Sequence, residues 1–413
     1  MAMTTTETDH LPVADPDMTA GRLRQIVEEL TASFLERQEV VRTLLLAVLA
    51  GQHALVLGPP GTAKSQLARE LTSRFTGARY WEVLLSKFTD PKRIFGPVDV
   101  GALTRDGEYR QLFEGRATQC EIAFVDEIFK CSSASLNEML AWLNERLYHP
   151  EAGGSPLECP LVSAITASNE LPADDELAAI YDRLLVRIEV GYLVDPTNFA
   201  ALVRSAVQTP TKSEPTTVDL ADLLHAVRVT VPAVQVPDGV INAICDLRRA
   251  LRRAELITSD RRWKQAIRLL QASAYLDGRA EVTDTDLEVL THVLWDSPAQ
   301  RPTVEREVLS LINPDARAAL DLGDAIAQIE RELDAKAGES HEKLSEWGTK
   351  EANKKLSTAR RKLEAMQKKA LADGRSTQSV DRVLAQLRAV TARVLIEALR
   401  IDPAVVRQTL DQD

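Results

Sequence analysis

Two amphipathic helices are predicted near the start of the chain. Apolar residues repeat at three- and four-residue spacing, as on one helix face, at Leu23, Ile26, Val27, Leu30 and Phe34. A second apolar stripe runs through residues 36–50, and Gly51-Gln52 interrupts it. Residues 1–20 are polar and acidic instead, so we expect a disordered lead-in there.

The pattern then changes to short, continuous apolar runs, which are typical of strands buried on both faces. Four such strands are predicted, at residues 54–57, 121–125, 161–167 and 185–190. Helical segments separate them, among them residues 64–75 and 133–146. Alternating strands and helices predict an α/β fold with a doubly wound parallel sheet.

The second half of the chain has a different character. Residues 201–320 predict several helices with prolines in the connections, and residues 321–413 are rich in Ala, Glu, Lys, Leu and Arg. The latter composition favours long helices, as in a helical hairpin or a coiled-coil-like region, with a turn at residues 372–376. We therefore expect four parts, with bounds at 1–20, 21–200, 201–320 and 321–413.

Composition narrows the class of protein. The chain has 413 residues, 45% hydrophobic and 27% charged, which is ordinary for a soluble globular protein. A net charge of −11 gives no general attraction to nucleic acid or anionic membranes. No long apolar run or secretory signal is seen, so we expect a cytoplasmic protein without a membrane span. No CxxC spacing occurs among the cysteines, which we expect to be reduced thiols: Cys120, Cys131, Cys159 and Cys245.

A phosphate-binding loop is predicted where the first strand ends, in the sequence GPPGTAKS. The usual pattern is GxxxxGK[ST], and here Ala63 replaces its last glycine. We expect Ala63 to begin the following helix with right-handed helical torsions, which suit alanine. Gly58 and Gly61 let backbone N–H groups fold around phosphate, and the helix N-terminus adds positive charge. The expected nucleotide-binding set is Gly58, Pro59, Pro60, Gly61, Thr62, Ala63, Lys64, Ser65 and Gln66. The alternative is a glycine-proline turn with an incidental lysine.

Acidic residues end the second strand, in the sequence FVDE. With a phosphate loop upstream, Lys64 can reach the β- and γ-phosphates of ATP, and Ser65 and Asp126 can bind Mg²⁺. Glu127 can polarise the water that attacks the γ-phosphate. The alternative is that the two acids cap a following helix.

A polar residue, Asn169, ends the third strand and is expected to lie between the first two motifs. There it can hydrogen-bond the attacking water or the γ-phosphate, although asparagine at a strand end is also ordinary turn chemistry.

Arginines near the ends of later elements are further candidates. Arg183, with Arg187 four residues on, is placed near the sheet edge, where it can reach the ATP of a neighbouring subunit. The alternative is a surface ion pair with Asp182. Ser259 is a plausible helix N-cap, and Arg261 or Arg262 after it can fold back onto phosphate; we prefer Arg262.

The ordered set GPPGTAKS, FVDEI, TASNELP, YDRLLVRI and SDRRWKQAIRLLQASA resembles the MoxR group of AAA+ ATPases, most closely its RavA-like members. The resemblance spans residues 22–300. It implies an α/β nucleotide-binding subdomain, a helical lid, and ring oligomers, usually hexamers, with ATP at subunit interfaces. On that pattern Asn169 matches sensor 1, Arg183 the arginine finger, and Arg261 or Arg262 sensor 2.

Two segments bear on what the resemblance implies beyond the nucleotide site. In this group an insert between the first helix and the acidic strand, here residues 86–112, projects toward the pore and can contact substrate. Asp106-Gly107 within it predicts a hairpin turn, and a purely structural hairpin is the alternative. RavA-like proteins also carry a small β-rich module, which the helical pattern of residues 340–375 argues against.

The resemblance implies an ATP-driven, chaperone-like remodeller of protein clients, often paired with a von Willebrand factor A (vWA) domain protein. One alternative is a nucleic-acid-stimulated motor using the basic run at residues 350–369, although a solvated helix face explains that run more simply. Another alternative is a nucleotide-switched scaffold with little turnover.

Overall fold

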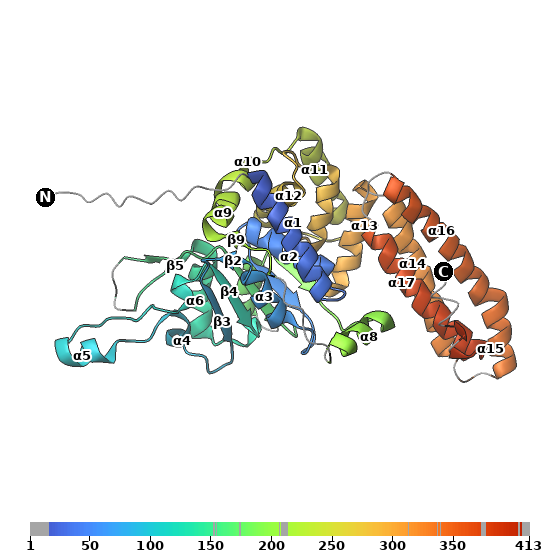
Figure 1. The fold of residues 1–413 in the computed structure, drawn as a ribbon, viewed down its shortest axis with the longest axis horizontal. Coiled ribbons are helices and arrows are strands. Elements are labelled where there is room, and N and C mark those ends of the chain that lie inside the picture. Colours follow the sequence, from blue (N-terminus) through green and yellow to red (C-terminus); the bar gives the residue numbers. More distant parts are fainter. Residues whose placement is uncertain are drawn as a thin grey trace. The chain divides into compact units, whose positions relative to one another are not determined.

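The computed structural model describes residues 16–406 apart from 152, 154, 173–174, 206, 208–213, 313, 337, 339, 373–376 and 404. The chain divides into two compact units (Figure 1). The first comprises the chain up to Cys245 together with Glu255–Arg301, and the second comprises Asp246–Ala254 and the chain from Pro302 onward. Residues 1–15 of the expected lead-in and residues 373–376 of the expected turn lie outside the described residues. The prediction of disorder is wrong for residues 16–20, which form the start of a helix at Pro16–Ser33, with Thr19 and Ala20 buried.

A five-stranded parallel sheet forms the centre of the first unit. Its strands lie in the order β3 (Tyr80–Leu84), β4 (Ile122–Asp126), β7 (Ser163–Ser168), β1 (Ala54–Leu57) and β8 (Val186–Glu189). The four predicted strands are confirmed, and so is the α/β fold class. The sequence prediction missed β3, an edge strand with only one buried residue, because it has no continuous apolar run.

The strand order brings three loops to one end of the sheet. β1 pairs with β7, and β7 pairs with β4, so these strands are neighbours although they are distant in sequence. All run in the same direction, so their carboxyl ends meet at one edge. The phosphate loop follows β1, the two acids end β4, and Asn169 follows β7.

Helices pack on this sheet through apolar faces. The helices that follow the predicted pattern are α1 (Pro16–Ser33), α2 (Gln38–Leu49), α3 (Lys64–Thr72), α6 (Ser133–Glu145) and α7 (Asp175–Arg183). α2 contacts β7 and β8, and α3 contacts β4 and β7. Nine of the twelve residues of α2 are buried, among them Leu44, Leu45 and Val48.

The segment at residues 86–112 differs from the prediction. It contains α4 (Pro91–Phe95) and α5 (Val100–Asp106), and Gly107 ends α5 in the left-handed region with φ of 69°. The predicted hairpin turn at Asp106-Gly107 is therefore wrong. The flanks do pair in antiparallel fashion, since Asp99 N–H donates to Arg110 O at 2.7 Å, but a helix connects them.

The remaining elements of the first unit are short, or belong to its helical part. The short strands are β2 (Phe75–Thr76), β5 (Leu147–Tyr148), β6 (Leu157–Glu158) and β9 (Val218–Asp219). The helices are α8 (Pro196–Ser205), α9 (Leu220–His225), α10 (Val231–Ala233), α12 (Asp260–Leu276) and the 3-10 helix η4 (Asp284–His292). The long helix α11 (Asp238–Arg253) has residues in both units.

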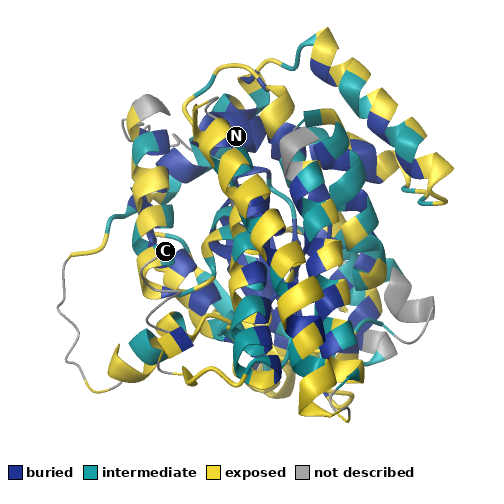
Figure 2. Cartoon of the chain, turned by 90° about the vertical axis from the view of Figure 1, so that its right-hand side faces the viewer, coloured by how far each residue is buried: buried dark blue, intermediate teal, exposed yellow. Residues whose placement is uncertain are grey.

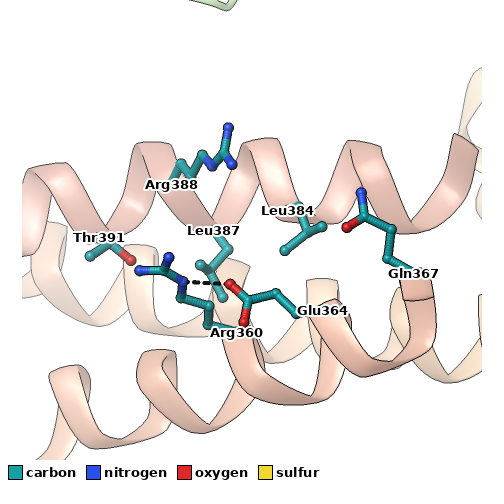
Figure 3. A pocket seen from close by; sticks show the side chains of 7 residues that line it. All are labelled: Arg360, Glu364, Gln367, Leu384, Leu387, Arg388 and Thr391. Atoms are coloured by element: carbon teal, nitrogen blue, oxygen red, sulfur yellow. Dashed lines mark hydrogen bonds and ion pairs between the residues drawn. The ribbon is translucent and has the colours of Figure 1, made fainter. Parts of the chain in front are cut away.

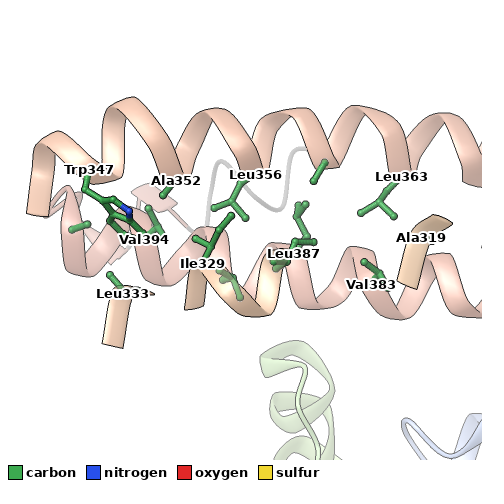
Figure 4. Packing of buried hydrophobic residues seen from close by; sticks show 14 of the residues in the cluster. Ala319, Ile329, Leu333, Trp347, Ala352, Leu356, Leu363, Val383, Leu387 and Val394 are labelled. Carbon is green, nitrogen blue, oxygen red and sulfur yellow. The ribbon is translucent and has the colours of Figure 1, made fainter. Parts of the chain in front are cut away.

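The second unit is a bundle whose core lies between three helices, α14 (Pro314–Ala335), α16 (Asn353–Ala372) and α17 (Gln378–Arg393) (Figure 4). α13 (Arg301–Ile312), α15 (His341–Trp347) and two π-helical segments, η6 (Gly348–Ala352) and η7 (Val394–Ala398), complete it. The prediction of long helices is confirmed, but three of them meet rather than the two of a hairpin. The described part of residues 340–375 is helical, as expected.

Alternating three- and four-residue spacing of core residues explains the bundle. On α17 and the start of η7 the core positions are Val380, Val383, Leu387, Val390 and Val394. The same spacing occurs in α16 at Leu356, Ala359, Leu363, Met366 and Ala370, where Met366 is only partly buried. This is the heptad pattern of coiled-coil seams. Buried residues accordingly form stripes along the helices in Figure 2.

The sequence also led us to expect unpaired cysteines and no membrane-spanning helix. All four cysteines are unpaired thiols, as predicted. Within the described part of the chain, no helix has the length and apolar character to cross a membrane.

Candidate nucleotide site

The phosphate loop connects β1 to α3 and is held by hydrogen bonds within itself. Thr62 Oγ1 donates to Pro59 O at 2.9 Å. The Lys64 ammonium donates to the carbonyl oxygens of Gly58 at 2.6 Å and Pro59 at 3.0 Å. Lys64 thus points back over the loop, toward the space that the loop encloses.

Glycine is required at the start of this loop. A Cβ on Gly58 would lie 2.1 Å from the carbonyl oxygen of Val190, so no other residue fits without moving the backbone. Gly58 N–H donates to Ser168 O at 3.1 Å, which ties the loop to β7. Gly61 has φ of 81°, in the left-handed region that favours glycine.

Ala63 corrects the sequence prediction. Its torsions are φ 64° and ψ 23°, so it lies in the left-handed region and not in the right-handed helical region. It is the N-cap of α3, and its methyl group offers no hydrogen bond to the helix. Alanine in this conformation costs about 1–2 kcal/mol relative to the right-handed region. The last glycine of the usual loop pattern is therefore replaced here at a position where glycine would fit without strain.

The acidic pair lies at the carboxyl end of β4. Asp126 is the last residue of the strand, and its Oδ1 accepts a hydrogen bond from Glu127 N–H at 3.0 Å. Glu127 follows in the left-handed region with φ of 54°. A non-glycine residue in this region costs about 1–3 kcal/mol and persists where the surrounding structure holds it, and the site motifs contain two such residues, Ala63 and Glu127.

Asn169 connects the two motifs directly. Its Oδ1 accepts from Lys64 Nζ at 3.1 Å, and its Nδ2 donates to Glu127 Oε1 at 2.8 Å. The structure therefore places Asn169 between the loop lysine and the second acid, as its position after the third strand predicted. The other carboxylate oxygen of Glu127 lies 3.3 Å from Lys130 Nζ.

Burial and neighbouring charges have opposite effects on the pKa of Lys64. Partial burial lowers the pKa of Lys64, while the nearby charges of Asp126 and Glu127 act in the other direction. Desolvation is the larger effect, because the Lys64 head group lies among loop carbonyls. A phosphate group taking the place of those carbonyls would add negative charge next to the ammonium.

The residues present fit a nucleoside triphosphate with Mg²⁺. The first turn of α3 presents backbone N–H groups that have no acceptor inside the helix. Lys64 adds a cation, and Ser65 and Asp126 add hard oxygen ligands of the kind Mg²⁺ prefers. Ser65 and Asp126 are both half-buried.

Of the predicted arginines, two are engaged within the unit. Arg262 is 5% exposed and pairs with Asp296 at 2.7 Å and Asp182 at 3.6 Å. Arg187 is fully buried, pairs with Asp296 at 2.8 Å, and stacks over the Tyr181 ring at 3.7 Å. Arg187 is therefore a structural residue.

The other two arginines are more accessible. Arg183 is half-buried in the last turn of α7, next to edge strand β8, and donates to Ala179 O at 2.7 Å. It does not form the alternative ion pair with Asp182, which pairs with Arg262 instead. Arg261 is exposed and bonds Asn144. Ser259 caps α12 as predicted, accepting from Arg262 N–H at 3.3 Å.

Two residues near the site were missed in the sequence. Lys130 pairs with Glu127, and its spacing of three residues on the same segment could have signalled this. Tyr192 is 61% exposed, and its hydroxyl donates to Pro60 O at 3.3 Å. No local pattern connects Tyr192 to the loop, because the contact depends on the pairing of β8 with β1.

Comparisons with known proteins agree with this geometry. Residues 21–228 match the family described as the MoxR domain in the MoxR-vWA-beta-propeller ternary systems, and residues 239–308 match the AAA lid domain. Two uncharacterised proteins of Methanocaldococcus jannaschii, MJ0079 and MJ0812, are each 33% identical to the chain. The first alignment covers 88% of this chain and 94% of the relative, and the second covers 75% and 81%.

A solved structure from Cytophaga hutchinsonii, described as a "putative ATPase", has the same fold with a TM-score of 0.58. It covers 72% of this chain and 96% of its own, at 16% identity. At that identity the likeness concerns the fold alone.

Proposed function

Because the chain belongs to the MoxR family of AAA+ ATPases, we propose that it binds ATP with Mg²⁺ at the loop after β1, hydrolyses it, and remodels a protein client. The observation that carries the proposal is the hydrogen-bonded series Lys64–Asn169–Glu127. It joins three motifs that lie far apart in the sequence at one edge of the sheet.

Each residue of the site has a distinct role in this proposal. Lys64 leaves the loop carbonyls and binds the β- and γ-phosphates, while the backbone N–H groups of residues 61–66 surround them. Ser65 and Asp126 would hold Mg²⁺, which would neutralise phosphate charge when bound. Glu127 accepts a proton from the attacking water, and Asn169 orients both that water and Glu127.

The assembly is also part of the proposal. We expect a ring, hexameric in the family pattern, in which Arg183 reaches the nucleotide of a neighbouring copy. Its place beside the edge strand supports this, since an edge is where a neighbour can approach. Arg262 as sensor 2 would have to exchange Asp296 for phosphate.

Client contact and partnership rest on two observations. The segment at residues 97–112 exposes Val100, Leu103, Tyr109 and Leu112, which offers apolar contacts to a client. The matched family is described in ternary systems with a vWA protein, so a vWA partner is proposed for this chain as well. A specifically RavA-like role stays a prediction from the sequence, and so does a cytoplasmic location.

A Glu127→Gln variant tests the proposal. It keeps the shape and the Asn169 contact but cannot accept a proton, so ATP binding should persist while turnover falls by roughly 100-fold or more. Binding is measured by calorimetry and turnover by phosphate release. Glu170→Gln, at an exposed neighbouring position, is the matched control and should behave as wild type. Wild-type turnover in Glu127→Gln would contradict the assigned base.

The same measurements separate the two alternatives. A nucleotide-switched scaffold would bind ATP with negligible turnover in the wild type. A nucleic-acid-stimulated motor would show phosphate release that rises when DNA or RNA is added, with a steep salt dependence. We expect neither result.

A further inference from the structure

Helix α16 carries a concentration of positive charge that the rest of the chain does not share. Asn353–Ala372 contains seven Lys or Arg residues and one Glu, within a chain whose net charge is −11. The six exposed basic residues form two rows with seven-residue spacing: Lys354, Arg361 and Lys368, and Lys355, Lys362 and Lys369. On a heptad helix, positions seven apart lie on one line along the surface.

Few of these charges are neutralised within the bundle. Among the described residues, Lys354, Lys355, Lys362 and Lys368 have no ion-pair partner. Elsewhere in the bundle basic residues do pair, as the exposed Lys350 does with Glu346 at 2.7 Å and the half-buried Arg393 with Glu330 at 2.8 Å. The positive surface of α16 is therefore available to an external negative charge.

A hollow of about 240 Å³ lies beside the first of these rows, between α16 and α17 (Figure 3). Leu384 and Leu387 give it an apolar part. Thr391 Oγ1 is buried there without a hydrogen-bond partner among the described residues. Glu364, also in the wall, is three residues from Arg361 and four from Lys368, so this wall adjoins the basic row.

Arginines line the same hollow. Arg360 is bonded to Glu364 at 2.7 Å, and the exposed Arg388 has no ion-pair partner in the described part of the chain. The hollow thus combines leucines, a hydrogen-bonding hydroxyl and excess positive charge. A ligand that complements it has an apolar group surrounded by negative charge.

We propose that this surface of α16 and α17 docks an acidic segment of a partner protein, with one apolar side chain of that segment inserted into the hollow. Charge complementarity favours an acidic ligand, and the leucines favour a peptide over a nucleic acid. Single-stranded nucleic acid is usually held by stacking on exposed aromatic residues, and neither α16 nor α17 contains an aromatic residue. Trp347, before η6, is only 7% exposed.

The test uses the full chain and a labelled synthetic peptide in which glutamates flank a single leucine. Binding is followed by fluorescence anisotropy. A peptide with serine in place of the leucine tests the hollow, and labelled single- and double-stranded DNA test the alternative ligand. The leucine peptide should bind most tightly, with an affinity that falls as salt is added.

Two variants assign the binding to this surface. Lys354→Glu combined with Lys368→Glu should weaken the leucine peptide by roughly tenfold, because two attractions become repulsions. The control combines Lys264→Glu with Lys343→Glu, which changes net charge equally at exposed positions outside α16 and should have little effect. Arg388→Glu, at the wall of the hollow, should weaken binding by a smaller factor of about three.

The outcomes are decisive in either direction. Selective loss in the α16 variants, together with preference for leucine over serine, supports the proposal. Absence of peptide binding, equal binding of the two peptides, tighter binding of DNA, or equal loss in the control pair would each overturn it. Phosphate release should be wild type in every variant, so failure of this proposal is distinct from failure of the ATPase assignment.

Discussion

The two units of the chain differ in the kind of side chain that they bury. In the first unit many polar side chains are buried, among them Arg187, His53 and Thr166, and each has defined hydrogen bonds. In the described part of the second unit Ser379 is the one polar residue that is buried as a whole, and the core is a seam of mostly aliphatic residues. Burying polar groups requires partners in fixed geometry, whereas a seam requires only shape and spacing.

This difference indicates where function depends on individual residues. The first unit keeps strained torsions at Ala63 and Glu127 and a lysine partly removed from water. Such features persist where the surrounding structure holds them in place. The bundle has its distinctive chemistry on the outside, in the charges of α16. Single substitutions at the nucleotide site of the first unit should therefore abolish activity, whereas single substitutions in the core of the second unit should alter stability.

The largest effect is expected from Lys64→Ala. It removes the cation that can meet the phosphates, so kcat/KM for ATP should fall roughly 1000-fold, or about 4 kcal/mol. Binding of a fluorescent ATP analogue should weaken as well, while the melting temperature changes little. Lys87→Ala, an exposed lysine of the same unit, is the control. Near-normal hydrolysis by Lys64→Ala would remove the basis for the site.

A substitution in the core of the bundle should lower stability and leave ATP turnover unchanged. Leu363 is fully buried on α16, and Leu363→Ala should destabilise the bundle by about 3 kcal/mol through lost contacts and a cavity. Hydrogen exchange of the bundle amides measures this, and ATP turnover should stay at the wild-type rate. Leu371→Ala makes the same change at a residue that is 66% exposed and should have almost no effect. A similar loss in both variants would show that the seam is not the stabilising core.

The sequence predicted that the three motifs lie together because each motif is local. The glycine loop, the acids ending a buried strand and the asparagine ending the next strand are all visible as runs of neighbouring residues. The fold class was predicted from the alternation of buried strands and helices along the chain. Edge strand β3 was missed because its exposed residues interrupt the apolar run. The third bundle helix was missed because composition predicts helical structure but not the number of helices.

Two errors have one physical origin. Left-handed glycine at residue 107 suits a hairpin turn and a helix C-cap equally, so the residue types could not distinguish them. Conversely, nothing in the identity of Ala63 signals a left-handed torsion, which is imposed by the loop around it. Local sequence constrains torsions only where the residue is selective. The roles of Arg183 and Arg262 depend on a neighbouring copy or a bound phosphate and stay predictions.

Buried His53 should make the first unit sensitive to mild acid. Its Nδ1 accepts from Ala164 N–H at 2.9 Å, so Nε2 carries the proton and donates to Leu143 O at 2.6 Å. Burial, followed by the nearby charge of Arg146, lowers the pKa of His53 well below its ordinary value. The unfolded chain therefore binds the proton first. Stability should be unaffected above the ordinary pKa of ~6.5 and should fall by up to about 1.4 kcal/mol for each pH unit below it.

The comparison variant for this effect is His53→Gln, which removes the titrating group. Denaturant unfolding of the first unit between mild acid and neutral pH should show a shallower dependence in the variant than in the wild type. The bundle, whose His341 is exposed, should show no such difference between the two proteins. Equal slopes in the wild type and His53→Gln would mean that carboxylates alone account for the acid sensitivity.

The smallest expected effect has a sign that separates the units. Ala63→Gly relieves the left-handed alanine but adds freedom to the unfolded chain, so the first unit should gain only about 0.5 kcal/mol. Ala365→Gly, at an exposed position inside α16, should cost about 1 kcal/mol, because a helix interior disfavours glycine. Thermal unfolding of both variants gives the comparison. A loss of stability in Ala63→Gly would show that contacts of the Ala63 methyl group stabilise the loop by more than the left-handed torsion costs. A gain in Ala63→Gly with a loss in Ala365→Gly would show that the same substitution reports backbone torsion in the first unit and helix propensity in the second.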